Sequence, residues 1–158
     1  MLRPVDQQDM RFLRDMLRHA YHWRLGDPDL PAFRYVQNWG RRGDAGVVAS
    51  DGPNEYGAAW YRLFPASEPG FGFVDEETPE LTVAFVPSRR GKGAGAELLR
   101  ALLTRAREDG FTAVSLSAPE EQTSYYEHYG FEVVEKTPQA VTMLARLYKL
   151  DHLYGLLL

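Results

Sequence analysis

Apolar residues near the N-terminus recur with the period of an α-helix. They fall three or four positions apart, at Met10, Leu13, Leu17, Ala20 and Tyr21. This spacing places them on one helix face that can pack against a core. Asp6 is predicted to cap the helix, with Val5 and Met10 at the spacing of a hydrophobic staple. A short strand before Asp6, a break at 26–28 and a second helix over 31–39 complete this predicted part.

The middle of the chain changes to the patterns of strands and turns. Residues 45–50 and 56–64 are predicted to pair as a hairpin, because 51–54 is strong turn sequence. A long loop, rich in glycine, aromatic and acidic residues, follows over 65–79. Residues 81–86 are apolar on both faces of the alternation, as expected for a central strand that is covered on both sides.

A helix and another strand follow this central strand. The helix opens in the glycine-rich segment 91–95, and Gly110 is predicted to end it in the left-handed conformation. Its buried stripe is predicted to consist of Leu98, Leu99, Leu102, Leu103 and Ala106. With the next strand at 113–117, the order strand, helix, strand predicts a right-handed crossover between parallel neighbours.

The remaining elements complete a mixed sheet. A short helix over 122–129 ends at Gly130, and strands follow near 131–135 and 140–148. The whole pattern predicts one domain over 1–158 of the α+β or mixed α/β class. We expect a central, mostly antiparallel sheet of about six to seven strands with one parallel β-α-β crossover, flanked by about four helices.

Composition and charge narrow the classes of function. The 158 residues include no cysteine, which excludes disulfides, thiolate metal sites and cysteine nucleophiles. His19 and His22 lack further ligands nearby, so we expect no metal site. The formal net charge of −4, from 18 Lys and Arg against 22 Asp and Glu, disfavours nucleic acid and membranes as partners.

The two ends of the chain carry further expectations. The start has no apolar stretch of a secretory signal and no apolar run is long enough to span a membrane, so we expect a cytoplasmic protein. The apolar tail 153–158 is too short to span. It is expected either to cover an apolar patch, to pack against another subunit as in a homodimer, or to fray.

The turn at 86–96 combines the features of an anion site. Glycines alternate at Gly91, Gly93 and Gly95, so backbone N–H groups from 92 to 96 can converge on an anion at the positive end of the helix. Arg89, Arg90 and Lys92 add positive charge at the same place. These features predict a phosphorylated ligand.

Three other interpretations of this turn are weaker. A Walker loop needs a hydroxyl residue after its lysine, whereas Gly93 follows Lys92. The dinucleotide pattern G-x-G-x-x-A is matched over 91–96, but residues 87–90 separate it from its strand and the first acidic residue near the end of the next strand is Glu120. The third interpretation is a helix start whose glycines only allow close packing. It does not explain why three cations, Arg89, Arg90 and Lys92, lie in the same segment.

Residues 80–131 resemble the GNAT N-acetyltransferase superfamily. That family has an Arg/Gln-x-x-Gly-x-Gly/Ala motif after a strand that ends like Val-x-Pro, and 84–87 followed by 90–95 matches both parts. A Tyr before a Gly-Phe pair is its second landmark, matched by Tyr126 and Gly130-Phe131. The resemblance implies the fold described above and acetyl-CoA as acetyl donor.

The resemblance also implies where the cofactor binds. Its pyrophosphate is expected at the glycine turn, and its pantetheine arm between the strand that ends at Val86 and the strand that begins near Ala113. The implied cofactor-binding residues are Phe85, Val86, Arg90, Gly91, Lys92, Gly93, Ala94, Gly95 and Ala96.

Acetyl transfer to an amine needs a base, because an alkyl ammonium is not nucleophilic until it loses a proton. Glu80 is the preferred candidate, since some family members place a glutamate at this spacing before Val86 and burial could raise its pKa. A solvated strand end or a pair with an arginine is an equally good interpretation of Glu80. Asp75, Glu76 and Glu77 are alternative bases, and their cluster could attract a cationic acceptor.

The other steps need hydrogen-bond donors. The backbone N–H of Phe85 or Val86 could hold the oxyanion if the strand bulges there, as the resemblance implies. Tyr126 is the matched acid for the departing thiolate, since a phenol is protonated at pH 7. A packed aromatic with a satisfied hydroxyl is the structural alternative for Tyr126. Tyr125 and Tyr129 are neighbours expected to point elsewhere on the helix.

These patterns predict an acetyl-CoA-dependent N-acetyltransferase that works by direct attack of a primary amine on the thioester. The alternatives are a non-catalytic acyl-CoA-binding sensor or assembly module with the same fold and, more distantly, a dinucleotide-binding oxidoreductase. The acceptor amine, a small molecule or polyamine, a protein N-terminus or a lysine, is left open, because one fold hosts many specificities.

Overall fold

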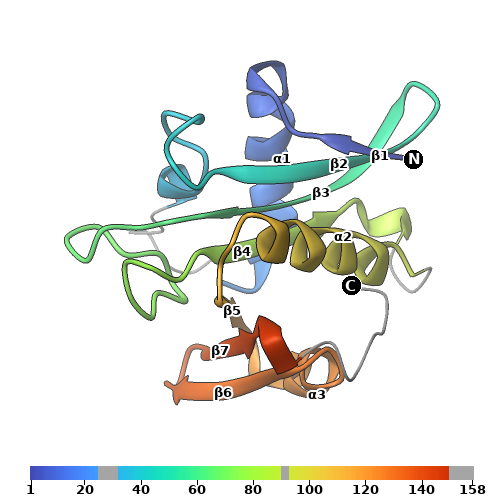
Figure 1. Cartoon of the computed structure of the whole chain (residues 1–158). Coiled ribbons are helices and arrows are strands. Elements are labelled where there is room, and N and C mark those ends of the chain that lie inside the picture. Colours follow the sequence, from blue (N-terminus) through green and yellow to red (C-terminus); the bar gives the residue numbers. More distant parts are fainter. Residues whose placement is uncertain (25–31, 90–92, 150–158) are drawn as a thin grey trace. The chain divides into compact units, whose positions relative to one another are not determined.

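The computed structural model describes residues 1–24, 32–89 and 93–149 of the chain (Figure 1). The predicted break at 26–28, the start of the second helix at Pro31, and the turn residues Arg90, Gly91 and Lys92 lie outside the described residues, as does the apolar tail 153–158. Within the described residues, no helix is long and apolar enough to cross a membrane.

Seven strands form one mixed sheet, with the hydrogen-bonded order β1-β2-β3-β4-β5-β7-β6. β4 and β5 pair in parallel, whereas the pairs β1–β2, β2–β3, β5–β7 and β6–β7 are antiparallel. The strands are β1 (Leu2–Pro4), β2 (Ala45–Asp51), β3 (Asn54–Arg62), β4 (Glu80–Phe85), β5 (Ala113–Ala118), β6 (Phe131–Lys136) and β7 (Val141–Arg146). The predicted mixed sheet with one parallel crossover is therefore confirmed.

Three α-helices lie within the described residues: α1 (Met10–Tyr21), α2 (Ala94–Glu108) and α3 (Thr123–Glu127). Asp6 caps the 3₁₀ turn Gln7–Asp9 that leads into α1, rather than α1 itself: its carboxylate accepts a hydrogen bond from the Gln8 amide, and Asp9 accepts one from the Asp6 amide. Gly110 and Gly130, which follow α2 and α3, have φ of 90° and 94°, as the left-handed ends predicted for them require.

Residues 32–39 differ from the predicted second α-helix. Ala32–Tyr35 forms a 3₁₀ turn, and the chain then reaches Asn38, whose φ of 54° lies outside the helical range. The Arg62 guanidinium donates to the carbonyls of Arg34 and Gln37. A continuing helix would engage these carbonyls with its own amides, so a side chain from a distant strand takes the place of helical hydrogen bonds.

The chain divides into two compact units. The first comprises Met1–Arg62 and Thr82–Leu102, and the second comprises Leu63–Leu81 and the chain from Leu103 onward. β4 begins in the second unit with Glu80 and Leu81 and continues in the first. The glycine turn with the start of α2 therefore belongs to the first unit, whereas Glu80, the loop before it and α3 belong to the second.

In the first unit, helices cover both faces of the strands. The Tyr21 hydroxyl on α1 lies 3.0 Å from the Thr82 hydroxyl on β4, so Thr82 faces α1. Phe85 has the opposite parity, and both its Cβ and a Leu98 methyl of α2 lie 3.0 Å from where a Cβ of Gly57 would stand. Figure 1 shows α1 behind β2 and β3. The predicted helix stripe is confirmed at Leu98, Leu99 and Leu102, each at most 1% exposed.

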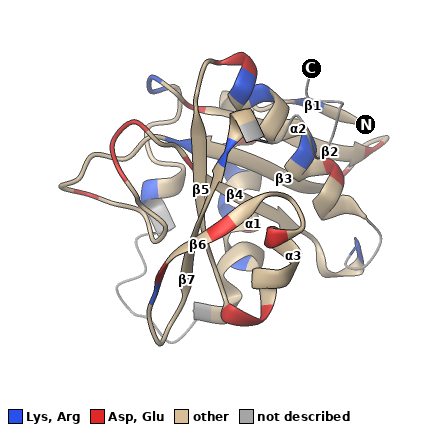
Figure 2. Ribbon diagram, turned by 60° about the horizontal axis from the view of Figure 1, so that its bottom comes forward, with Lys and Arg blue, Asp and Glu red and all other residues tan. Residues whose placement is uncertain are grey.

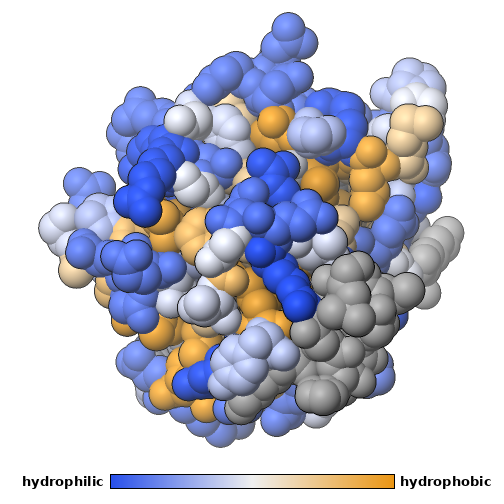
Figure 3. Space-filling view, in the orientation of Figure 1, coloured by the Kyte–Doolittle hydropathy of each residue, from blue (hydrophilic) through white to orange (hydrophobic). Residues whose placement is uncertain are grey.

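In the second unit, β7 lies between β5 and β6. Its register pairs Ala113 with Arg146 and Phe131 with Ala145, and the β6 pairing shifts between Val133 and Glu135. The two neighbours of β7 differ in polarity: β5 has no charged residue, whereas β6 carries acidic and basic residues, which are red and blue in Figure 2. β5 is thus a mostly buried strand, and β6 is an exposed strand at the edge of the sheet. Hydrophilic residues cover much of the face shown in Figure 3.

Candidate active site

The described part of the glycine turn presents the first amides of α2. Gly93 has φ of 80°, a conformation that favours glycine, although a Cβ there would meet nothing within 4 Å. α2 begins at Ala94, and its first amides, including those of Gly95 and Ala96, have no acceptor within a helix of this kind. These amides are available to an anion at the positive end of the helix.

Arg89 contributes a cation beside this turn. Its guanidinium pairs with Asp51 in the β2–β3 turn and stacks over the Tyr56 ring, 4.1 Å from the ring centroid. Burial, together with the charge of Glu97, raises the pKa of the Tyr56 hydroxyl. The sequence shows the arginine but not its partner Asp51, which lies 38 residues away.

The end of β4 separates the two predicted oxyanion donors. The Val86 N–H donates to the Tyr56 carbonyl at 2.8 Å, so it is used within the fold. Successive amides of an extended strand point to opposite sides. The Phe85 amide therefore points away from β3, and it is the better placed of the two for an oxyanion.

Glu80 is a buried carboxylate. The residue is 1% exposed, and one carboxylate oxygen accepts a hydrogen bond of 3.0 Å from the Gly72 amide. Gly72 in turn lies against β5, since a Cβ there would stand 2.6 Å from the Leu116 carbonyl carbon. The interpretation of Glu80 as a solvated strand end is wrong, because the loop before β4 covers it.

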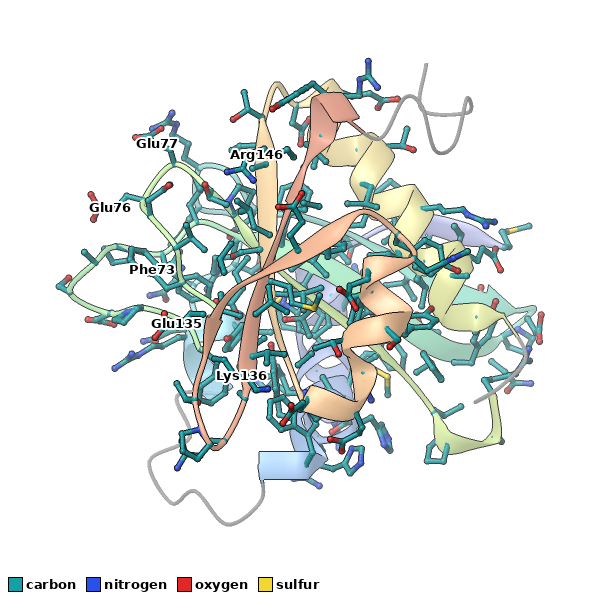
Figure 4. All side chains as sticks on the ribbon, turned by 90° about the horizontal axis from the view of Figure 1, so that it is seen from below. Phe73, Glu76, Glu77, Glu135, Lys136 and Arg146 are labelled. Carbon is teal, nitrogen blue, oxygen red and sulfur yellow. The ribbon has the colours of Figure 1, made fainter. Side chains whose placement is uncertain are left out.

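The other acidic candidates lie in the open. Asp75, Glu76 and Glu77 are exposed, and Figure 4 shows Glu76 and Glu77 at the outer rim of their loop, pointing away from the strands. Their hydrogen bonds hold the loop itself: Glu76 accepts from the Ala66 amide at 2.8 Å and Asp75 from the Glu77 amide at 2.9 Å. Of the four acidic residues considered as the base, only Glu80 is therefore removed from water.

Tyr126 has an unusual hydroxyl for a packed aromatic. Its ring meets the rings of Tyr125 and Phe131 edge to face, with centroids 5.2 and 5.8 Å away. The residue is half-buried, yet desolvation of the phenol raises its pKa to about 12. The hydroxyl makes no hydrogen bond to any described residue. Within the described residues, the Tyr126 ring therefore has two aromatic packing partners and its hydroxyl has no hydrogen-bond partner.

The neighbouring tyrosines have different surroundings. Tyr125 is 44% exposed and Tyr129 is 6% exposed. Both rings contact each other, with centroids 5.2 Å apart.

Two serines of β5 were missed by the motif analysis. The Oγ atoms of Ser115 and Ser117 are buried and make no hydrogen bond to any described residue. Ser115 is the parallel partner of Glu80 in the β4–β5 register. The signal in the sequence was two serines at alternate positions of an otherwise apolar strand.

The N-terminal aromatic residues form part of the core. Tyr21 and Tyr35 are 4% and 0% exposed, and their ring centroids lie 5.2 Å apart. Among the residues that the structure describes, no three His, Asp or Glu side chains gather in a way that could hold a metal ion.

A comparison with protein families gives the assignment. The model of the acetyltransferase (GNAT) family matches residues 10–131, which include Glu80, the glycine turn and Tyr126. The chain belongs to the GNAT acetyltransferase family. The resemblance seen in the two sequence landmarks is thereby confirmed. Among curated protein sequences, none matches this one.

Solved structures share the GNAT fold of this chain. YncA, a putative acetyltransferase from Salmonella typhimurium solved with its cofactor acetyl-CoA, is 21% identical with a TM-score of 0.69 over 93% of each chain. An aminoglycoside 6'-N-acetyltransferase complexed with coenzyme A is 16% identical, with a TM-score of 0.67 over 93% of this chain and 97% of that one.

A third structure with this GNAT fold is a ribosomal-protein-alanine N-acetyltransferase from Brucella melitensis. It is 20% identical, with a TM-score of 0.65 over 92% of this chain and 99% of that one. At these identities the likeness concerns the fold, and the two of these proteins whose names specify an acceptor differ in it.

Proposed function

We propose that this GNAT protein is an N-acetyltransferase that moves the acetyl group of acetyl-CoA to a primary amine by direct attack, with residues 1–158 acting as one catalytic domain. The observation that carries the proposal is the Tyr126 hydroxyl, which is desolvated, protonated at neutral pH and without a hydrogen bond to the described residues. A protonated hydroxyl of this kind can donate a hydrogen bond to a ligand. Two structural neighbours solved with coenzyme A or acetyl-CoA support the choice of donor.

The cofactor phosphates are assigned to the glycine turn. The amides of Ala94, Gly95 and Ala96 at the start of α2 suit a pyrophosphate, because they lie at the positive end of the helix dipole. Arg90 and Lys92 are assigned to the same phosphates on the family motif. Neither assignment needs a metal ion, since cations and amides neutralise the charge.

Glu80 is the proposed base. A primary ammonium must give up one proton before its nitrogen can attack the thioester carbon. A carboxylate that the loop before β4 holds away from water is suited to receive that proton, and the Gly72 amide fixes its position. Attack then forms the C–N bond, and the carbonyl oxygen becomes an oxyanion. The Phe85 amide is the proposed donor to that oxyanion.

Collapse of the intermediate breaks the C–S bond and releases a thiolate. Tyr126 is the proposed donor to this sulfur. With the tyrosine pKa at about 12 and a thiol pKa near 8.5, full proton transfer is uphill by about 5 kcal/mol. Tyr126 therefore stabilises the thiolate chiefly through a hydrogen bond, and the second proton of the attacking nitrogen supplies the thiol.

Ligand-dependent thermal unfolding tests the cofactor assignment. At about 100 times its dissociation constant, acetyl-CoA adds about 2.7 kcal/mol, which raises Tm by about 5 to 11 °C in a domain of this size. We expect this increase with acetyl-CoA and CoA but not with NADH or ATP. An increase with NADH alone indicates the oxidoreductase, and none with acetyl-CoA or CoA refutes the proposal.

Transfer is measured as thiol release from acetyl-CoA over a panel of small amines, polyamines and peptides with free N-termini or lysines. Tyr126→Phe is expected to lower kcat at least about 10-fold, whereas Tyr125→Phe, at an exposed neighbour of similar size, keeps the wild-type rate. If the protein binds acetyl-CoA but releases no thiol with any amine of the panel, the result indicates the non-catalytic sensor or assembly module instead.

A further inference from the structure

The two β5 serines carry hydroxyls that the fold does not explain. Ser115 is 0% exposed, and neither its Oγ nor that of Ser117 has a hydrogen-bond partner among the described residues. A buried polar group without a partner destabilises a protein, because it has lost its hydrogen bonds to water. Alanine already occupies two other positions of β5, so a small apolar residue suits this strand.

These hydroxyls lie beside the proposed base. Ser115 and Ser117 are two positions apart on an extended strand, so they share one face of β5. Ser115 is also the in-register partner of Glu80 on the parallel neighbour β4, and paired residues of adjacent strands project to the same side. One face of the second unit therefore carries a row of three polar residues, Ser117, Ser115 and Glu80.

The two ends of this row differ in burial. Ser117 is a partly exposed residue, whereas Ser115 and Glu80 are 0% and 1% exposed. A substrate amine is too bulky to reach a carboxylate covered to this extent, because the loop residue Gly72 already lies against β5 and hydrogen-bonds to Glu80. Only a proton has to travel from the amine to the base.

We propose that Ser117 and Ser115, joined by bound water, conduct the proton of the acceptor amine to Glu80. Residues two apart on a strand are separated by about 6.6 Å, and a chain of two water molecules with three hydrogen bonds of about 2.8 Å each is long enough to join their hydroxyls. Adjacent strands lie about 4.8 Å apart, within reach of the longer glutamate side chain. The proposal rests on the N-acetyltransferase function proposed above.

The relay leaves each serine unchanged. The ammonium gives its proton to the Ser117 oxygen, and the proton on that oxygen passes through water to Ser115. The proton of Ser115 passes to the Glu80 carboxylate, which becomes a carboxylic acid. The amine nitrogen regains its lone pair and attacks the thioester. Each oxygen along the row accepts one proton and donates one, so no charge is left on β5.

The test compares Ser115→Ala and Ser117→Ala with the wild-type enzyme. We expect kcat to fall about 10²-fold in Ser115→Ala, with the KM for acetyl-CoA and the Tm increase caused by acetyl-CoA unchanged. Its own Tm is expected to equal or exceed the wild-type value, because an unpartnered hydroxyl has been removed. Ser117→Thr retains a hydroxyl at a partly exposed position and is expected to retain kcat, unlike Ser117→Ala.

Ser124→Ala, at an exposed serine of α3, serves as the control and is expected to keep the wild-type kcat. An unchanged kcat in Ser115→Ala, in an active wild-type background, overturns the relay and leaves the proposed function standing. A loss of Tm or of acetyl-CoA binding together with activity also overturns it, because the serine is then structural. A wild-type protein without turnover on any amine refutes the proposed function, and the relay falls with it.

Discussion

Removal of one partner of the Arg62–Asp44 pair should strongly destabilise the first unit, because both charges are buried. The two side chains are 0% and 1% exposed. They make two parallel hydrogen bonds, Nε to Oδ1 at 2.9 Å and Nη2 to Oδ2 at 2.7 Å. The remaining donor atom, Nη1, donates to the carbonyls of Arg34 and Gln37, and the Trp39 ring centroid lies 5.5 Å from the guanidinium carbon.

Asp44→Asn removes the charge at nearly constant volume and leaves the guanidinium buried without its counterion. Loss of one partner of a buried pair destabilises a protein by about 3 to 5 kcal/mol, because the remaining charge has been taken out of water without compensation. For a domain of this size, 1 kcal/mol changes Tm by about 2 to 4 °C. We therefore expect Tm to fall by about 6 to 20 °C in thermal unfolding followed by circular dichroism.

The matched control is Asp109→Asn, which breaks an exposed pair between Arg105 of α2 and the residue that follows this helix. The side chains of Arg105 and Asp109 are 41% and 33% exposed, and Nε of Arg105 lies 3.1 Å from Oδ2 of Asp109. Such surface pairs contribute about 0 to 1 kcal/mol to the free energy of unfolding. Its Tm should change by less than about 4 °C. The double substitution Asp44→Leu with Arg62→Met should recover part of the loss, since an apolar pair leaves no buried charge. If Asp44→Asn and Asp109→Asn have the same small effect, the argument from burial is refuted.

Three further predictions concern the second unit and the start of α1. Gly72→Ala places a Cβ 2.6 Å from the Leu116 carbonyl carbon, so Tm is expected to fall by about 2 to 12 °C; an unchanged Tm in the purified variant contradicts the close contact. Because burial raises the Tyr126 pKa to about 12, the pH profile of kcat/KM should show no loss from this group near pH 10, where an ordinary tyrosine ionises; such a loss, absent in Tyr126→Phe, contradicts the burial. The hydrogen bond from Arg3 lowers the Asp9 pKa below its usual value of 3.8, so the carboxylate contributes stability above that pH which is lost as the pH falls through its lowered pKa. Asp9→Asn should therefore be less stable than wild type at pH 7 and should approach it below about pH 3 in urea unfolding; a difference that is independent of pH contradicts the ion pair.

Local rules gave most of the elements of this fold. Asp6 caps the 3₁₀ turn before α1 because its short carboxylate reaches the Gln8 amide two residues away. Gly110 and Gly130 end their helices because the turn needs a positive φ at those positions. Each of these features depends on neighbours in the chain, so the sequence is enough to predict it. The family landmarks at 90–95 and 126–131 are of the same kind, since each motif consists of consecutive residues.

The motif analysis named the catalytic candidates but not their environments. Glu80 was equally consistent with a solvated strand end until the loop residue Gly72 was seen to cover it. Val86 and Phe85 were equivalent oxyanion donors until the Tyr56 carbonyl was found to accept from Val86. The predicted helix over 31–39 gave way to a 3₁₀ turn because Arg62 reaches into that segment.

The sequence by itself thus determined the order of the strands and of α1, α2 and α3, the glycines that end α2 and α3, and the family, because hydrophobic period and glycine conformation act over a few residues. Tertiary structure alone decided which polar groups lose water. The burial of Glu80, the Arg62–Asp44 pair and the unpartnered hydroxyls of β5 arise from segments up to tens of residues apart. Desolvation depends on everything packed around a group, and neither periodicity nor spacing along the chain records that packing.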